Sequence, residues 1–193
     1  VYANWSYLKN HALDNGAFRN LALEWVAYVA GKRESRRLMG DVVLTQNDIL
    51  RQVAYEDASV TTSWTIDLHY PDPKNARFFS GDEFKAVCNQ EEIELYPIPY
   101  RCFYSRNVSN LFMAGRNISV THVALGTVRV MRTTAMMGEV VGMAAAVCRR
   151  HDVLPRTVYT SYLPELRSLM QKGCGQQDLP NNQQFNIGRR KHH

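Results

Sequence analysis

The hydrophobic pattern of the first quarter of the chain predicts two helices and one short strand. Apolar residues share one broad face over residues 15–29, which favours a helix, although residues 25–30 fit a strand equally well. Residues 42–44 are apolar and typical of a short strand. Thr45 follows them, and Asp48 stands at the capping-box spacing from Thr45, which predicts the start of a helix.

The middle of the chain carries the signals of strands. Residues 60–68 are β-branched and aromatic, which predicts a strand, and residues 95–104 contain prolines that suit an extended edge. Residues 107–110 are typical of a turn. Residues 111–114 are apolar throughout, which is the pattern of a strand buried on both faces.

Helical signals dominate the remainder of the chain. A long apolar stretch predicts a helix over residues 128–150, and Pro155 separates it from a short amphipathic helix over residues 163–170. Glutamine, asparagine and glycine replace apolar residues over residues 172–193, which are expected to be disordered. Together these elements predict an α/β fold.

Charge and hydropathy argue against two classes of partner. The net charge is +5, but the basic residues fall in small scattered groups without interleaved aromatic residues, so we expect no nucleic-acid partner. Residues 135–148 are the most apolar stretch. They have about half the length of a membrane span and contain Glu139, which predicts a buried helix and no membrane partner. No leader follows Val1, so the sequence predicts no compartment.

The cysteines predict no metal site. Cys88, Cys102, Cys148 and Cys174 form no C-x-x-C pair, and none lies beside a histidine at the spacing of a zinc site. Cys148 ends an apolar helical stretch and is expected to be a buried, reduced thiol. A disulfide between Cys88 and Cys102 remains open.

Residues 110–148 are the segment with the clearest chemical signal. They combine a buried strand, a glycine, a polar loop, a second glycine and a helix. Gly115 lies at the predicted strand end, where ligands bind in α/β sheets and where a missing side chain lets a ligand approach the backbone. The helix is expected to begin near Gly126, so that its free N–H groups face an electron-rich or anionic group.

Small residues recur along this helix at Ala135, Gly138, Gly142 and Ala145. An interior glycine destabilises a helix by about 1 kcal/mol relative to alanine. Close approach of a strand or a flat cofactor would offset that cost. Tight packing of the helix on a sheet, with no ligand, explains the same pattern.

Two blocks of this segment, residues 110–119 and residues 124–131, resemble the closing FAD motif of the FAD-dependent oxidoreductase superfamily. They are particularly similar to a bacterial family called FAD dependent oxidoreductase, some of whose members carry labels related to xanthan lyase. Residues 32–41 and residues 64–69 resemble the same family. The similarity extends over residues 15–172, with the blocks in the family's order.

The resemblance implies a fold and a cofactor. Residues 108–171 would be the C-terminal part of a Rossmann-like FAD-binding domain with a packing helix, and residues 1–107 part of a mixed α+β substrate-side domain. The strand end would lie against the pyrophosphate and ribityl chain, and the second glycine turn beside the isoalloxazine. Arg129 opposes the dipole of the predicted helix, which favours a nearby anion. The cofactor-binding residues are therefore expected to be Gly115, Arg116, Asn117, Gly126, Thr127, Val128 and Arg129.

Three departures from the family pattern limit these expectations. Other flavoprotein classes place an acidic residue where this chain has Arg116, and many relatives have a cysteine at the position of Asn117. The G-x-G-x-x-G fingerprint that cradles the pyrophosphate does not occur in these residues. An N-terminal FAD-binding half is therefore expected in the same or another chain, and this segment alone is expected to be inactive.

Three residues are candidates for catalysis. Flavin-linked oxidation needs a base, and histidine titrates near neutral pH. His122 lies in the loop between the two predicted cofactor contacts, and His69 ends a predicted strand; either fits a structural, hydrogen-bonded histidine as well. Asp67 is a potential orienting partner of His69. Arg36 would bind a substrate carboxylate or the flavin, unless an ion pair between Glu34 and an arginine explains this loop.

The functional prediction is flavin-linked dehydrogenation of an alcohol or carbohydrate-like small-molecule substrate, by analogy with the family. Two alternatives remain open. One is a non-catalytic, flavoprotein-like binding or structural module, and the other is a carbohydrate-active lyase that needs no flavin.

Overall fold

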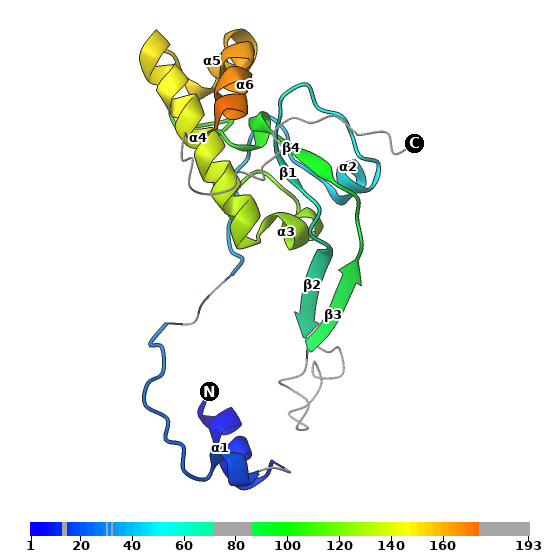
Figure 1. Cartoon of the computed structure of the whole chain (residues 1–193), viewed down its shortest axis with the longest axis vertical. Coiled ribbons are helices and arrows are strands. Elements are labelled where there is room, and N and C mark those ends of the chain that lie inside the picture. Colours follow the sequence, from blue (N-terminus) through cyan, green and yellow to red (C-terminus); the bar gives the residue numbers. More distant parts are fainter. Residues whose placement is uncertain (13–14, 30, 32, 72–85, 174–193) are drawn as a thin grey trace. The chain divides into compact units, whose positions relative to one another are not determined.

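The computed structural model describes residues 1–12, 15–29, 31, 33–71 and 86–173 (Figure 1). The predicted tail lies almost entirely outside the described residues, as does Cys174. The chain divides into two compact units, Val1–Arg33 and Glu34–His193. The predicted boundary at residue 107 stays a prediction.

The first unit consists of α1 (Tyr2–Asn10) and a single 3-10 turn, η1 (Asn15–Phe18). The helix predicted over residues 15–29 is wrong, because the described residues after Phe18 have no regular structure. Lys9 Nζ donates to the carbonyl oxygens of Phe18 and Leu21, at 3.2 and 2.8 Å. Leu21 and Trp25 remain exposed, so no packed surface stabilises a helix here.

Two small antiparallel sheets form the strand content of the second unit within its described residues. One pairs β1 (Ala58–Thr62) with β4 (Tyr96–Pro99), and the other pairs β2 (Ile66–Pro71) with β3 (Ala86–Glu91). The strand predicted over residues 60–68 is therefore divided between two sheets.

The local sequence predictions for the segments around these sheets are partly confirmed and partly wrong. Thr45 and Asp48 form the predicted capping box of α2 (Gln46–Leu50). The strands predicted over residues 42–44 and 111–114 are wrong, because each contributes only one isolated bridge, Leu44–Val120 and Tyr104–Phe112. Ala114 is exposed, so the second segment is not buried on both faces. The extended segment that begins with β4 turns into a 3-10 helix, η3 (Tyr100–Cys102).

The helix predicted over residues 128–150 begins later than expected. Helix α3 (His122–Val128) ends first, Arg129 caps it, and Val130 is extended before α4 (Met131–His151) begins. Arg129 is held in this break by bonds from its guanidinium to Asp67. Neither proline nor glycine marks the break, so the pattern gave no stop signal. The last helices are α5 (Pro155–Ser161) and α6 (Leu163–Lys172).

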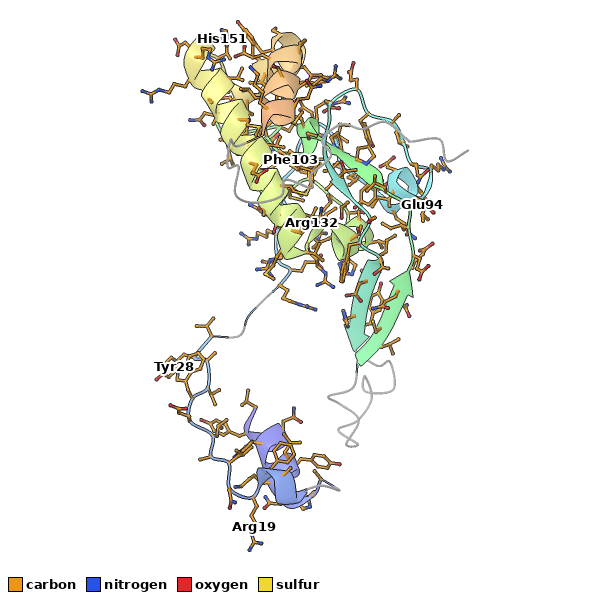
Figure 2. All side chains as sticks on the ribbon, in the orientation of Figure 1. Arg19, Tyr28, Glu94, Phe103, Arg132 and His151 are labelled. Carbon is orange, nitrogen blue, oxygen red and sulfur yellow. The ribbon has the colours of Figure 1, made fainter. Side chains whose placement is uncertain are left out.

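The core of the second unit lies between α4 and the elements that it covers, which are β1, α5 and α6. Met137, Val140 and Val147 of α4 are fully buried, as is Phe103, which is labelled in Figure 2. Residues from both sides of position 107 share this core.

The small-residue face of α4 is open within the described structure. Ala135, Gly138, Gly142 and Ala145 are all exposed, and a Cβ built at either glycine meets no heavy atom of the described residues within 4 Å. The close approach expected for this face is therefore not made by any described segment.

The combination of helices with small sheets confirms the α/β class. Within the described ranges, parallel pairing is limited to the Leu44–Val120 bridge. Among the helices of the described residues, none combines the length and apolarity needed to cross a bilayer.

Candidate functional site

Residues 115–117 form an exposed turn, hereafter the open turn. The backbone of Gly115 has φ +96°, a conformation that residues other than glycine rarely adopt. Its N–H donates to Met137 Sδ at 3.4 Å, and the Asn117 carbonyl accepts from Leu38 N at 2.9 Å. The side chains of Arg116 and Asn117 are exposed. The turn is thus fixed through its backbone while its outer surface stays free of described neighbours.

Residues 126–129 form a buried counterpart, hereafter the packed segment. The structure places Gly126, Thr127 and Val128 at the C-terminal end of α3, so the expected helix N-terminus is not there. A Cβ at Gly126 would lie 3.0 Å from Leu68 Cδ2 and 3.1 Å from the Asp67 carbonyl oxygen. These contacts make the packed segment a close-packed junction with β2.

The polar side chains of the packed segment also form hydrogen bonds with other residues of the chain. Thr127 Oγ1 donates to the Trp64 carbonyl at 2.6 Å and accepts from Tyr96 Oη at 3.1 Å. Arg129 Nη2 donates to the Asp67 carbonyl at 2.9 Å and to its carboxylate at 3.2 Å. The anion expected beside Arg129 is therefore met by Asp67 of the chain itself.

His122 begins α3 and pairs with a carboxylate far away in the sequence. Its Nδ1 lies 2.8 Å from both carboxylate oxygens of Glu34. Glu34 also pairs with Arg37, which confirms the predicted Glu34–arginine ion pair. Burial opposes ionisation of Glu34, but the hydrogen bond and charge of His122, with Arg37, outweigh it, so the Glu34 pKa lies below its usual value.

This arrangement orients the His122 ring. Nδ1 faces Glu34, and no described residue hydrogen-bonds to Nε2, while the Tyr70 ring lies edge-on with centroids 6.3 Å apart. The side chain is half exposed. A histidine held at one nitrogen by a carboxylate can accept a proton at the other. Sequence reasoning missed Glu34 as this partner, because no local spacing links residues 88 positions apart.

Arg36, the third predicted catalytic residue, is exposed and follows Glu34 by two positions. It forms no ion pair with the part of the chain that the structure describes, whereas its neighbour Arg37 does. Arg36 therefore keeps its hydrogen-bond donors available for a ligand.

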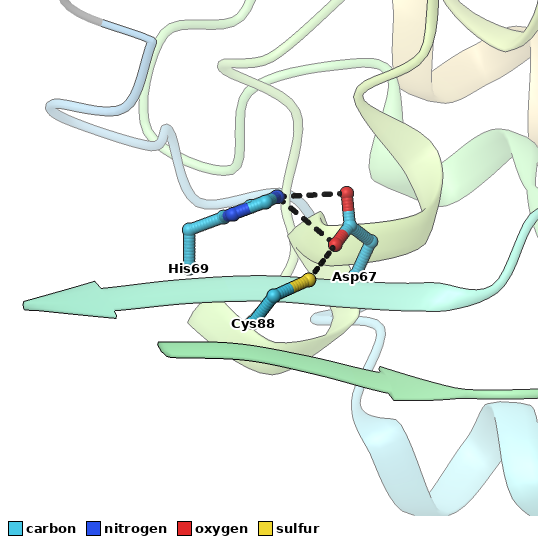
Figure 3. A group of neighbouring side chains, drawn as sticks. All are labelled: Asp67, His69 and Cys88. Atoms are coloured by element: carbon cyan, nitrogen blue, oxygen red, sulfur yellow. Dashed lines mark hydrogen bonds and ion pairs between the residues drawn. The ribbon is translucent and has the colours of Figure 1, made fainter. Parts of the chain in front are cut away.

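His69 lies in a separate group on β2. Its Nε2 is 3.0 Å from the nearer carboxylate oxygen of Asp67, so Asp67 orients His69, as one of the open alternatives expected. Cys88 of β3 donates from Sγ to the same carboxylate at 3.3 Å (Figure 3). Cys88 and Cys102 are both free thiols, which excludes the disulfide between them.

Comparison with known proteins identifies the family. A model of the FAD dependent oxidoreductase family matches residues 2–170. The chain belongs to the FAD dependent oxidoreductase family. No curated protein and no solved structure matches this family member.

Family membership implies FAD, and the described residues permit part of that contact. A Cβ built at Gly115 meets no described atom within 4 Å, so a ligand can approach the open turn closely. The Arg116 guanidinium beside it suits a phosphate. The packed segment offers no comparable space, since Gly126, Thr127 and Val128 are buried. Among the described residues, the open turn therefore has the space and the positive charge that suit a cofactor phosphate. The packed segment packs against β2 instead.

Proposed function

We propose that this chain forms one wall of an FAD site through the open turn. The Gly115 backbone and the Arg116 guanidinium would hold the phosphate and ribityl part of the cofactor. The observation that supports this role is one turn that combines a glycine at positive φ with an exposed arginine, neither of them covered or ion-paired by the described residues. FAD, when bound, accepts a hydride from the substrate.

We further propose that His122 is the base that removes the substrate proton. Glu34 would fix the ring and stabilise its positive charge, leaving Nε2 to take the proton of a substrate hydroxyl. The carbon–hydrogen bond then supplies the hydride, and a carbonyl product forms. Burial raises the pKa of Glu34, but His122 and then Arg37 lower it further than burial raises it, which favours the ionised carboxylate. The 2.8 Å distances between His122 and Glu34 carry this proposal.

The substrate class is proposed as a small alcohol or carbohydrate-like molecule. A base that acts on a hydroxyl suits an alcohol, and Arg36 is exposed, with no ion pair to a described residue, so its donors can meet hydroxyl or carboxylate groups of the substrate. His69 is left out of this proposal, because it faces Asp67 on β2 in a group separate from His122 and Glu34.

The test uses the protein expressed from its complete gene, with FAD bound and oxygen excluded. Bleaching of the flavin by glycerol, D-glucose or D-mannitol would be followed by absorbance. We expect His122→Gln to slow bleaching by about 10²- to 10⁴-fold, the usual worth of a general base, with FAD affinity unchanged.

His151→Gln is the matched control. His151 also pairs with a carboxylate, Glu165, but stands at the far end of α4 (Figure 2). The flavin of the His151→Gln variant should bleach at the wild-type rate. Equal rates for His122→Gln and wild type would refute the base assignment. No bleaching by any polyol or sugar would refute the substrate class.

A further inference from the structure

Three metal-binding side chains meet on one face of the β2–β3 hairpin. Asp67 and His69 are two residues apart on β2, and side chains alternate between the faces of a strand, so both lie on the same face. Antiparallel pairing sets Cys88 directly opposite His69. The hairpin register thus unites side chains that no spacing rule along the chain connects.

The three groups already share a centre. Their ligand atoms all lie within 4.8 Å of one another (Figure 3). His69 Nε2 and Cys88 Sγ both converge on the Asp67 carboxylate, at 3.0 and 3.3 Å. A single cation bound by the three side chains would replace these two contacts to the carboxylate.

We propose that Asp67, His69 and Cys88 form a Zn²⁺ site. Thiolate sulfur, imidazole nitrogen and carboxylate oxygen are the ligands that zinc takes in proteins. On binding, the Cys88 thiol releases its proton to solvent and the sulfur bonds to the metal, while His69 binds through the Nε2 lone pair. The charges of the carboxylate and the thiolate then cancel that of the dication.

The surroundings fit a site with three protein ligands. Bonds of about 2.0–2.3 Å to zinc require only small movements of side chains that already cluster. Arg129 donates to the other Asp67 oxygen and to its backbone carbonyl, so the carboxylate keeps its orientation when a metal binds. His69 and Cys88 are exposed, which leaves the fourth position for water.

Cys88 Sγ already donates to Asp67, so the thiol faces the carboxylate that would bind the same metal. The proposal departs from the sequence-based prediction of no metal site, which considered spacing along the chain alone.

The experiment is a titration of the chelator-treated full chain with Co²⁺, a spectroscopic substitute for zinc. We expect one equivalent of Co²⁺ to produce the near-ultraviolet band of a thiolate–cobalt bond, and one equivalent of Zn²⁺ to abolish it. Cys88→Ser should remove the band. Loss of a residue that only orients a metal ligand weakens metal binding by about 10- to 100-fold. His69→Gln and Asp67→Asn remove ligands themselves and should each weaken Co²⁺ binding by at least that much.

Two control variants separate this site from other ligands. Cys148→Ser removes the half-buried thiol near the end of α4, and the double variant H192A/H193A removes the terminal histidines. Both should titrate like wild type. A wild-type chain without the thiolate–cobalt band, or a Cys88→Ser variant that retains it, would overturn the proposal.

Discussion

The open turn and the packed segment began as two equal candidates for cofactor contact, and the structure separates them. Gly115 has room for a ligand above it, whereas a Cβ at Gly126 would press against Leu68 and Asp67. Arg116 is exposed, whereas Arg129 is bound to Asp67. A glycine in a motif can therefore mark either close approach of a ligand or close approach of the chain itself.

This difference gives each region its own experimental signature. Substitutions in the packed segment should lower stability and leave FAD affinity unchanged. Substitution of Arg116 in the open turn should lower FAD affinity with little effect on stability, whereas a side chain at Gly115 also strains the backbone at φ +96°. The following predictions test that division, from the largest expected effect to the smallest.

Gly126→Ala should lower the free energy of unfolding by about 1–3 kcal/mol, the usual cost of overpacking. The new methyl group would lie 3.1 and 3.2 Å from backbone atoms of Asp67. That backbone is fixed by pairing with β3 and by Arg129, so it cannot yield easily. Denaturant unfolding measures the change. Loss of FAD affinity at unchanged stability would instead make Gly126 a cofactor contact.

Thr127→Val should lower the free energy of unfolding by about 1.5 kcal/mol, because it leaves the buried Tyr96 hydroxyl without its acceptor. The same substitution removes the donor to the Trp64 carbonyl. Thr127→Ser keeps the hydroxyl and should recover most of the stability in the same unfolding assay. If both variants unfold like wild type, these hydrogen bonds do not hold the packed segment.

Gly138→Ala should stabilise the chain by about 1 kcal/mol, because alanine is the better helix former and the added Cβ meets open space. Thermal unfolding of the 193-residue chain measures it. A destabilised variant would show that another segment or molecule covers the small-residue face of α4.

Glu34 should make stability depend weakly on pH. Its pKa in the folded chain lies below the ordinary value of 4.5, so its contribution is present above that pH and is lost as pH falls further. Because the pair is partly exposed, we expect less than about 1 kcal/mol. Glu34→Gln should flatten this dependence. A difference between the two proteins that does not change with pH would contradict the assignment.

Local chemistry was predictable from the sequence, and long-range pairing was not. The capping box of Thr45 and Asp48 depends on residues three apart, and the sequence shows it directly. The pairing of His122 with Glu34, and of His69 with Cys88, depends on how distant segments fold together. The family resemblance located the glycine segments but could not show which one is buried.

The break at Arg129 illustrates the same limit within one helix. The sequence predicts one helix over residues 128–150, yet α3 ends at Val128 and α4 begins at Met131, and the Arg129 guanidinium between them is bound to Asp67. Tertiary contacts thus overrode a continuous local pattern. Because of the break, no helix begins at Gly126, and the open turn is the segment that we propose as the cofactor contact.

The most direct test of the account is the absorbance spectrum of the protein expressed from its complete gene, compared with Gly115→Leu. We predict flavin bands in the wild type. Gly115→Leu, whose side chain would fill the space above the open turn, should bind FAD at least about tenfold more weakly, a loss of at least about 1.4 kcal/mol, and should lose flavin on dilution. A wild-type protein that stays colourless after FAD is added would contradict the account. So would a folded Gly115→Leu variant with full flavin content.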